Sequence, residues 1–150
     1  MMGAILSFSE TPYFAWFGLN ERLRLCANQQ ERAALCARDG LVCIGEGKHK
    51  HVFQLNSEWV LKVGSVAAVS RDAYVWSLVS LPYSRFYAPT YFEDFLEIQR
   101  FGTPLVVGCD IWKLRKVAKH DGVWDIRVQN IRQFGPEAKI IDGRPKKWPL

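Results

Sequence analysis

The sequence lacks any apolar run of the roughly 20 residues that a membrane-spanning helix requires. It also lacks an internal repeat and a low-complexity tract, which excludes solenoids and biased linkers. The first residues have neither the basic start nor the long apolar block of a secretion signal, so the expected location is the cytoplasm.

Cysteine is scarce and shows no close metal-ligand spacing. No His–Cys or Ser–His–Asp arrangement is evident either. We therefore predict free, buried thiols in a reducing compartment, with disulfides as the alternative. The four cysteines are Cys26, Cys36, Cys43 and Cys109.

Charged residues are also few, at 23%, while 49% of the chain is apolar and 13% aromatic. This composition excludes a disordered chain and allows a real core. A length of 150 residues fits one domain, or two small lobes that share a cleft.

The net charge of +5 is unevenly spread, because residues 111–150 hold ten Lys/Arg against four acids. Such a basic stretch could bind nucleic acid or another anionic surface. The alternative is a solubilising face that also supplies countercharges for a bound nucleotide. No RNA- or DNA-binding signature is present, so no specific nucleic-acid partner is expected.

Hydrophobic periodicity predicts alternating helices and short strands. Asp39-Gly40 is expected to end the first helix, and Gly135-Pro136 to form the turn of a hairpin. The predicted helices cover 20–38, 66–80 and 111–119; the predicted strands cover 41–44, 51–55, 59–64, 88–92 and 95–99; the predicted hairpin covers 131–141.

Three oxygen-bearing side chains near the end of the chain are candidate ligands of a magnesium-bound nucleotide. Asp125 precedes Asn130 by five residues, and Asp142 follows the predicted hairpin. A hairpin would bring Asp142 back beside Asn130. Carboxylate and amide oxygens are suitable magnesium ligands. The alternative is that these polar residues only cap turns.

Lys62 stands in the middle of an apolar strand, where an unpaired ammonium is costly to bury. We expect it to pair with a carboxylate: Asp72, or Asp142 in the absence of nucleotide. A lysine that reaches along the strand to solvent is the alternative.

The order of these elements and residues resembles the protein-kinase fold over residues 41–143. Gly45-x-Gly47-x4-Val52 is similar to the glycine-rich loop, and Val60-Leu61-Lys62 to the third-strand lysine. The resemblance implies an α+β fold with an N-terminal extension (1–40), an antiparallel sheet lobe with a helix (41–102) and a much reduced C-terminal lobe (103–150). It assigns nucleotide binding to Gly45, Gly47, Val52 and Lys62, catalysis to Asp125 and Arg127, and magnesium binding to Asn130 and Asp142.

Several residues depart from the kinase pattern. Lys50 replaces the third loop glycine, and Val123-Trp124 precedes Asp125 where kinases have His-Arg. No glutamate lies in the helix after Lys62; Asp72 is the only acid there, and Glu93 is a second candidate. Only eight residues follow Asp142, so no activation segment is expected in this stretch.

The resemblance therefore implies a minimal ATP- and magnesium-dependent phosphotransferase that acts on Ser/Thr of a protein substrate. The first alternative is a pseudokinase, a module that binds ATP or a protein partner without catalysis. A small-molecule kinase is the second alternative. A chain of this size also suits an effector delivered into the cytoplasm of a host cell.

Overall fold

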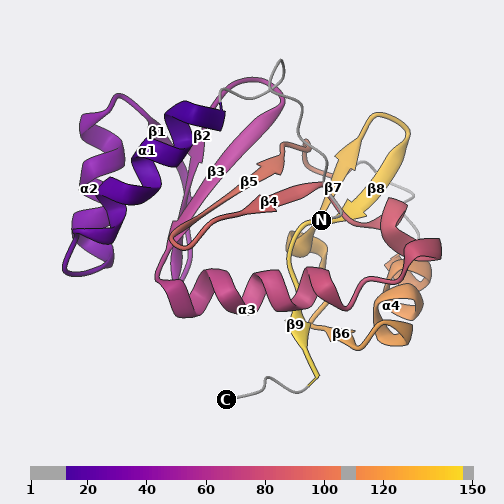
Figure 1. Ribbon diagram of the computed structural model, residues 1–150. Helices are drawn as coiled ribbons and strands as arrows, with labels where there is room; N and C mark the ends of the chain where they lie inside the picture. The colour runs from indigo at the N-terminus through magenta and orange to yellow at the C-terminus, as the bar shows by residue number, and fades with distance from the viewer. Residues whose placement is uncertain (1–12, 106–110, 147–150) are drawn as a thin grey trace.

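A computed structural model of the protein describes residues 13–105 and 111–146, and its arrangement is shown in Figure 1. The helices are α1 (Tyr13–Arg24), α2 (Gln29–Arg38), α3 (Val66–Ser77) and α4 (Ile111–His120), with 3-10 turns at Leu81–Phe86 and Val128–Asn130. The strands are β1 (Val42–Glu46), β2 (Lys50–Gln54), β3 (Trp59–Gly64), β4 (Thr90–Phe92), β5 (Leu96–Arg100), β6 (Val123–Trp124), β7 (Ile131–Phe134), β8 (Glu137–Ile140) and β9 (Arg144–Pro145). From residue 41 on, the helices and longer strands follow the order expected from the sequence, and the short strands β6 and β9 were not expected.

The centre of the fold is a five-stranded antiparallel sheet with strand order β1-β2-β3-β5-β4. Side chains alternate across it because successive residues of a strand point to opposite faces. The outer face carries Trp59, Leu61 and Val63 of β3, and the inner face carries Val60 and Lys62. The predicted α+β class with an antiparallel sheet is thus confirmed.

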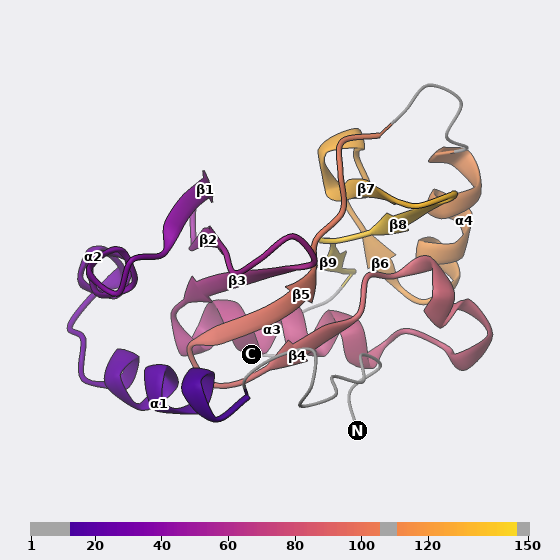
Figure 2. The same ribbon diagram turned by 90° about the horizontal axis from the view of Figure 1, so that it is seen from above.

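Two hydrophobic cores hold the molecule together. Helices α1 and α2 cover the outer face of the sheet and form the first core, whereas α3, α4 and the C-terminal strands form the second. Figure 2 shows α1 and α2 at one end of the molecule and β7, β8 and α4 at the other. The first core contains Leu19, Leu23, Leu35, Cys36, Phe53, Trp59, Leu61, Val63, Leu96 and Ile98; the second contains Val75, Tyr87, Leu114, Val117, Ala118, Val123, Ile126, Ile131 and Ile140.

The single helix predicted over 20–38 is wrong, because two helices meet there. Asn28 ends the connection between them: its side chain accepts a hydrogen bond of 2.9 Å from the backbone N–H of Glu31. Asparagine is a favoured residue for capping a helix start. The predicted end at Asp39-Gly40 is confirmed, since Gly40 adopts φ +88° just after α2.

The three described cysteines are free, as predicted, but the prediction that they are buried is wrong for Cys26 and Cys43. Only Cys36 is buried, and burial raises the pKa of its thiol to about 12. Cys43 is exposed because it lies on β1, an edge strand. Cys109 lies outside the described residues.

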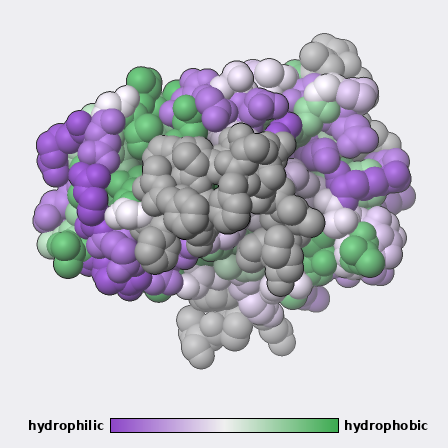
Figure 3. Space-filling model, turned by 45° about the horizontal axis from the view of Figure 1, so that its top comes forward, coloured by the Kyte–Doolittle hydropathy of each residue, from purple (hydrophilic) through white to green (hydrophobic). Residues whose placement is uncertain are grey.

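No helix of the described chain is both long and apolar enough to cross a membrane. The face in Figure 3 carries many hydrophilic side chains, with hydrophobic ones in smaller separate groups.

Candidate functional site

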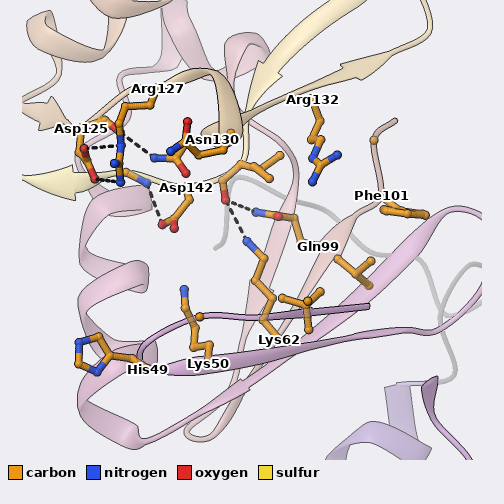
Figure 4. A pocket seen from close by; sticks show the side chains of 18 of the residues that line it. His49, Lys50, Lys62, Gln99, Phe101, Asp125, Arg127, Asn130, Arg132 and Asp142 are labelled. Atoms are coloured by element: carbon orange, nitrogen blue, oxygen red, sulfur yellow. Dashed lines mark hydrogen bonds and ion pairs between the residues drawn. The ribbon is translucent and has the colours of Figure 1, made fainter. Parts of the chain in front are cut away.

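A pocket of about 330 Å³ opens between the inner face of the sheet and the loops around Asp125 and Asp142 (Figure 4). One part of its wall is apolar, and the other part is polar and charged. All eight residues assigned by the sequence to catalysis, nucleotide or metal line this one pocket. They are Gly45, Gly47, Val52, Lys62, Asp125, Arg127, Asn130 and Asp142.

The turn between β1 and β2 is closed by a hydrogen bond of 2.9 Å from the N–H of Gly47 to the carbonyl of Lys50. A Cβ on Gly45 would meet only Val52, at 3.6 Å, and a Cβ on Gly47 only the carbonyl of Lys50, at 3.8 Å. The protein's own packing therefore does not demand glycine at either position. What these glycines leave open is space at the pocket wall, where a ligand could approach the backbone closely.

The free energy of unfolding of Gly47→Ala is accordingly expected to stay within about 0.5 kcal/mol of the wild-type value. It should weaken Mg–ATP binding about fivefold, the equivalent of roughly 1 kcal/mol, because the added methyl keeps phosphates from the backbone. Thermal unfolding and calorimetric titration measure the two effects.

Gly102→Ala is the control for the stability measurement, because this glycine is closely packed. Its Cβ would lie 2.6 Å from Cβ of Arg132 and 2.7 Å from the ring of Phe134. That variant should lose about 1–3 kcal/mol of stability through overpacking. If Gly47→Ala binds ATP as tightly as the wild type, the turn between β1 and β2 does not belong to the nucleotide site.

Lys62 does not pair with Asp72, so the predicted partner is wrong. Its Nζ donates a hydrogen bond of 3.0 Å to the carbonyl of Ile141, which also accepts one of 3.0 Å from Gln99. Among the ion pairs of the described residues, none joins Lys62 to a carboxylate. Lys62 thus ties β3 to the backbone just before Asp142 (Figure 4).

Asp72 pairs instead with Lys50, which enters from β2. Lys50 also lies 3.6 Å from a carboxylate oxygen of Glu97 on β5. Burial raises the pKa of Glu97 well above its ordinary value, with Asp72 adding to the effect against the attraction of Lys50. Burial opposes the charge of Asp72, but a hydrogen bond to Glu97 and the charge of Lys50 lower its pKa overall.

Glu97 was not predicted from the sequence as a site residue. Its position is set by register, since Glu97 stands opposite Lys62 in the β3–β5 pair. Glu97 could have been predicted from the alternation of side chains along paired strands, because residues that stand opposite each other point to the same face.

Asp125 has an unusual backbone, with φ +66°. Residues other than glycine seldom adopt this left-handed conformation, although aspartate does so more often than most, and such residues cluster at active sites and ligand clamps. Both carboxylate oxygens face arginines: Oδ1 lies 3.0 Å from Nε of Arg127, and Oδ2 lies 3.5 Å from Nε of Arg144. Arg144 was also missed from sequence.

The amide of Asn130 donates a hydrogen bond of 2.7 Å to the carbonyl of Asp125. This contact directs the donor end of the amide inward and leaves its oxygen available. The backbone carbonyl of Asn130 accepts a hydrogen bond of 2.9 Å from Ile141, because β7 and β8 pair as the predicted hairpin. Asp142 therefore follows directly beside the Asn130 loop, as expected.

Asp142 uses one carboxylate oxygen, Oδ1, to accept a hydrogen bond of 2.8 Å from Gly143. Its other oxygen and the amide oxygen of Asn130 are hard donors that fit magnesium, which takes one or two protein ligands and completes its shell with phosphates and water. The described residues hold no group of three or more His, Cys, Asp or Glu that would form an all-protein metal cage. The donor set thus fits a nucleotide-borne magnesium better than a structural metal.

The charge of the pocket wall is strongly positive. Eight lysine and arginine side chains line it, against two aspartates. A polyanionic ligand would be attracted to such a wall. The cationic residues are Lys48, Lys50, Lys62, Arg71, Arg100, Arg127, Arg132 and Arg144, and the acids are Asp125 and Asp142.

Comparison with known proteins adds no relative. A scan against protein-family models, a search of curated proteins and a search of solved structures each gave no significant match.

Proposed function

We propose that the protein is a minimal, protein-kinase-like phosphotransferase that uses ATP and magnesium and acts on Ser/Thr hydroxyls of a protein substrate. The observation that carries the proposal is the convergence on one cationic pocket of a glycine turn, two lysines of the sheet, and the loops of Asp125 and Asp142. Apart from the second lysine, Lys50, these are the groups that the kinase resemblance expects to act together.

The wall of the pocket suits the two halves of a nucleotide. Val52, Val60 and Phe101 offer apolar contact to a base. The glycine turn and the lysines of the inner face would meet the phosphates. Asn130 and Asp142 would hold the magnesium, which would neutralise the charge of the phosphates.

Asp125 would accept the proton of the substrate hydroxyl, and Arg127 would neutralise charge on the transferring phosphoryl group. For this step Asp125 must release one oxygen from its arginine partners, Arg127 and Arg144. Displacement of Arg127 toward a bound phosphate would free Oδ1 and place the guanidinium where negative charge develops.

The same ion pairs favour the second candidate, a pseudokinase-like module that binds ATP or a protein partner without transfer. If Asp125 stays paired with both arginines when nucleotide is bound, it has no free oxygen to receive a proton. The role of Arg127 therefore separates the two candidates.

The test is transfer from γ-labelled ATP to the protein itself and to lysate proteins, with magnesium and with EDTA. Magnesium-dependent label on serine or threonine supports the phosphotransferase. Binding of Mg–ATP without transfer supports the non-catalytic module, and absence of binding rejects the nucleotide site.

A further inference from the structure

We propose that Lys50, on β2, is the principal phosphate-binding cation of this pocket and that Asp72 of α3 holds it in position. The inference rests on the proposed nucleotide site and assigns within it a residue that the sequence resemblance leaves out. The resemblance gives this role to Lys62. In our proposal Lys62 instead holds the backbone at Ile141, beside Asp142.

The path of Lys50 into the pocket depends on Gly64. The two residues stand opposite each other in the antiparallel β2–β3 pair, and Val52 stands opposite Lys62. Lys50 and Lys62 are therefore diagonal neighbours on the inner face. A Cβ on Gly64 would lie 2.8 Å from Cγ of Lys50. The absence of a side chain at Gly64 thus leaves space for the aliphatic part of Lys50 to pass over β3 on the inner face of the sheet.

Two carboxyl groups fix the far end of this side chain. Asp72 forms an ion pair with Nζ of Lys50, and Glu97 lies 3.6 Å from the same atom. Both acids are buried, at 4% and 2% exposure, so the ammonium is held against the sheet and α3. Among the described residues only Asp72 accepts a hydrogen bond from Lys50, so two of the three N–H donors of the ammonium remain for a ligand in the pocket.

Lys62 is held quite differently. Its hydrogen bond goes to the neutral carbonyl of Ile141, and burial together with the nearby Lys50 ammonium lowers its pKa. Burial also opposes the charge on Lys50, but Glu97, Asp72 and Asp142 outweigh it and raise the pKa of Lys50 above its ordinary value. Of the two lysines, Lys50 is thus the one that an ion pair with a buried carboxylate holds in the pocket.

The experiment compares Lys50→Met with Lys62→Met, two variants that remove one ammonium each from the same face of the sheet. Calorimetric titration with Mg–ATP should show at least a tenfold loss of affinity for Lys50→Met and a smaller loss for Lys62→Met. The reverse order of effects would overturn the inference. Wild-type protein that fails to bind Mg–ATP would instead reject the proposed function.

Asp72→Asn tests whether Asp72 acts through Lys50. It keeps the volume of the side chain but removes the charge, and Asp39→Asn, at an exposed pair with Arg22, is the matched control. If Asp72 positions Lys50, the double variant Asp72→Asn/Lys50→Met should bind Mg–ATP no more weakly than Lys50→Met. Fully additive losses would show that Asp72 acts by another route.

A measurement on wild-type protein avoids any dependence on the folding of these variants. The ¹⁵N NMR signals of the lysine side-chain nitrogens report the surroundings of each lysine with and without Mg–ATP. We expect Mg–ATP to shift the signal of Lys50 more than that of Lys62. An unchanged Lys50 signal would overturn the assignment.

Discussion

Asp125→Ala is expected to reduce phosphoryl transfer by about 10²–10⁴-fold, the usual contribution of a positioned general base. Asp125 would touch the substrate hydroxyl and not the nucleotide, so the loss should appear in kcat. Affinity for Mg–ATP should remain within about twofold, since removal of the carboxylate breaks no contact with phosphate. Transfer kinetics and calorimetry on the same preparation measure both quantities.

Asp125→Asn is the matched control for this experiment. Asparagine tolerates the left-handed backbone that φ +66° imposes, whereas alanine adds a strain of about 1–2 kcal/mol. Both variants should lose transfer equally, but only Asp125→Ala should show lower thermal stability. Transfer that survives in either variant would remove Asp125 from the mechanism.

Asp142→Ala should have the largest effect on nucleotide binding. Its free carboxylate oxygen is the strongest magnesium donor in the pocket, and a charge-assisted contact is worth about 1.5–3 kcal/mol, so Mg–ATP affinity should fall roughly 10–150-fold. Titration of magnesium at fixed ATP should show the shift, and Asn130→Ala should show a smaller one in the same direction.

Metal-free ATP provides the control. Without magnesium, the negative charge of Asp142 repels phosphate, so Asp142→Ala should bind metal-free ATP as well as the wild type or better. A variant that loses ATP affinity equally with and without magnesium would show that Asp142 supports the pocket structurally and does not hold the metal.

Much of the fold was accessible from sequence because the strands are short apolar or alternating runs that end at residues typical of turns. The β3 segment and the hairpin around Gly135-Pro136 lie where expected, and the hairpin brings Asp142 beside Asn130. Short-range geometry, set by hairpin length, was sufficient for that part of the site.

The pairing of Asp72 with Lys50 was not accessible in the same way. It depends on how α3 packs over the sheet and on the space opened by Gly64, both of which are tertiary features. The break between α1 and α2 was missed for a related reason. The helical periodicity around Leu23 and Cys26 continues through Asn28 in the sequence. In the structure, however, the side chain of Asn28 caps the start of α2 and separates the two helices.

The composition of the two cores also sets an order for folding during synthesis. Every member of the first core lies between Leu19 and Ile98, so this core can close before the last third of the chain has left the ribosome. The second core extends from Val75 to Ile140 and must wait for β8. The lysines of the sheet would thus be in place before the loops of Asp125 and Asp142 leave the ribosome, and the nascent chain would complete its pocket last.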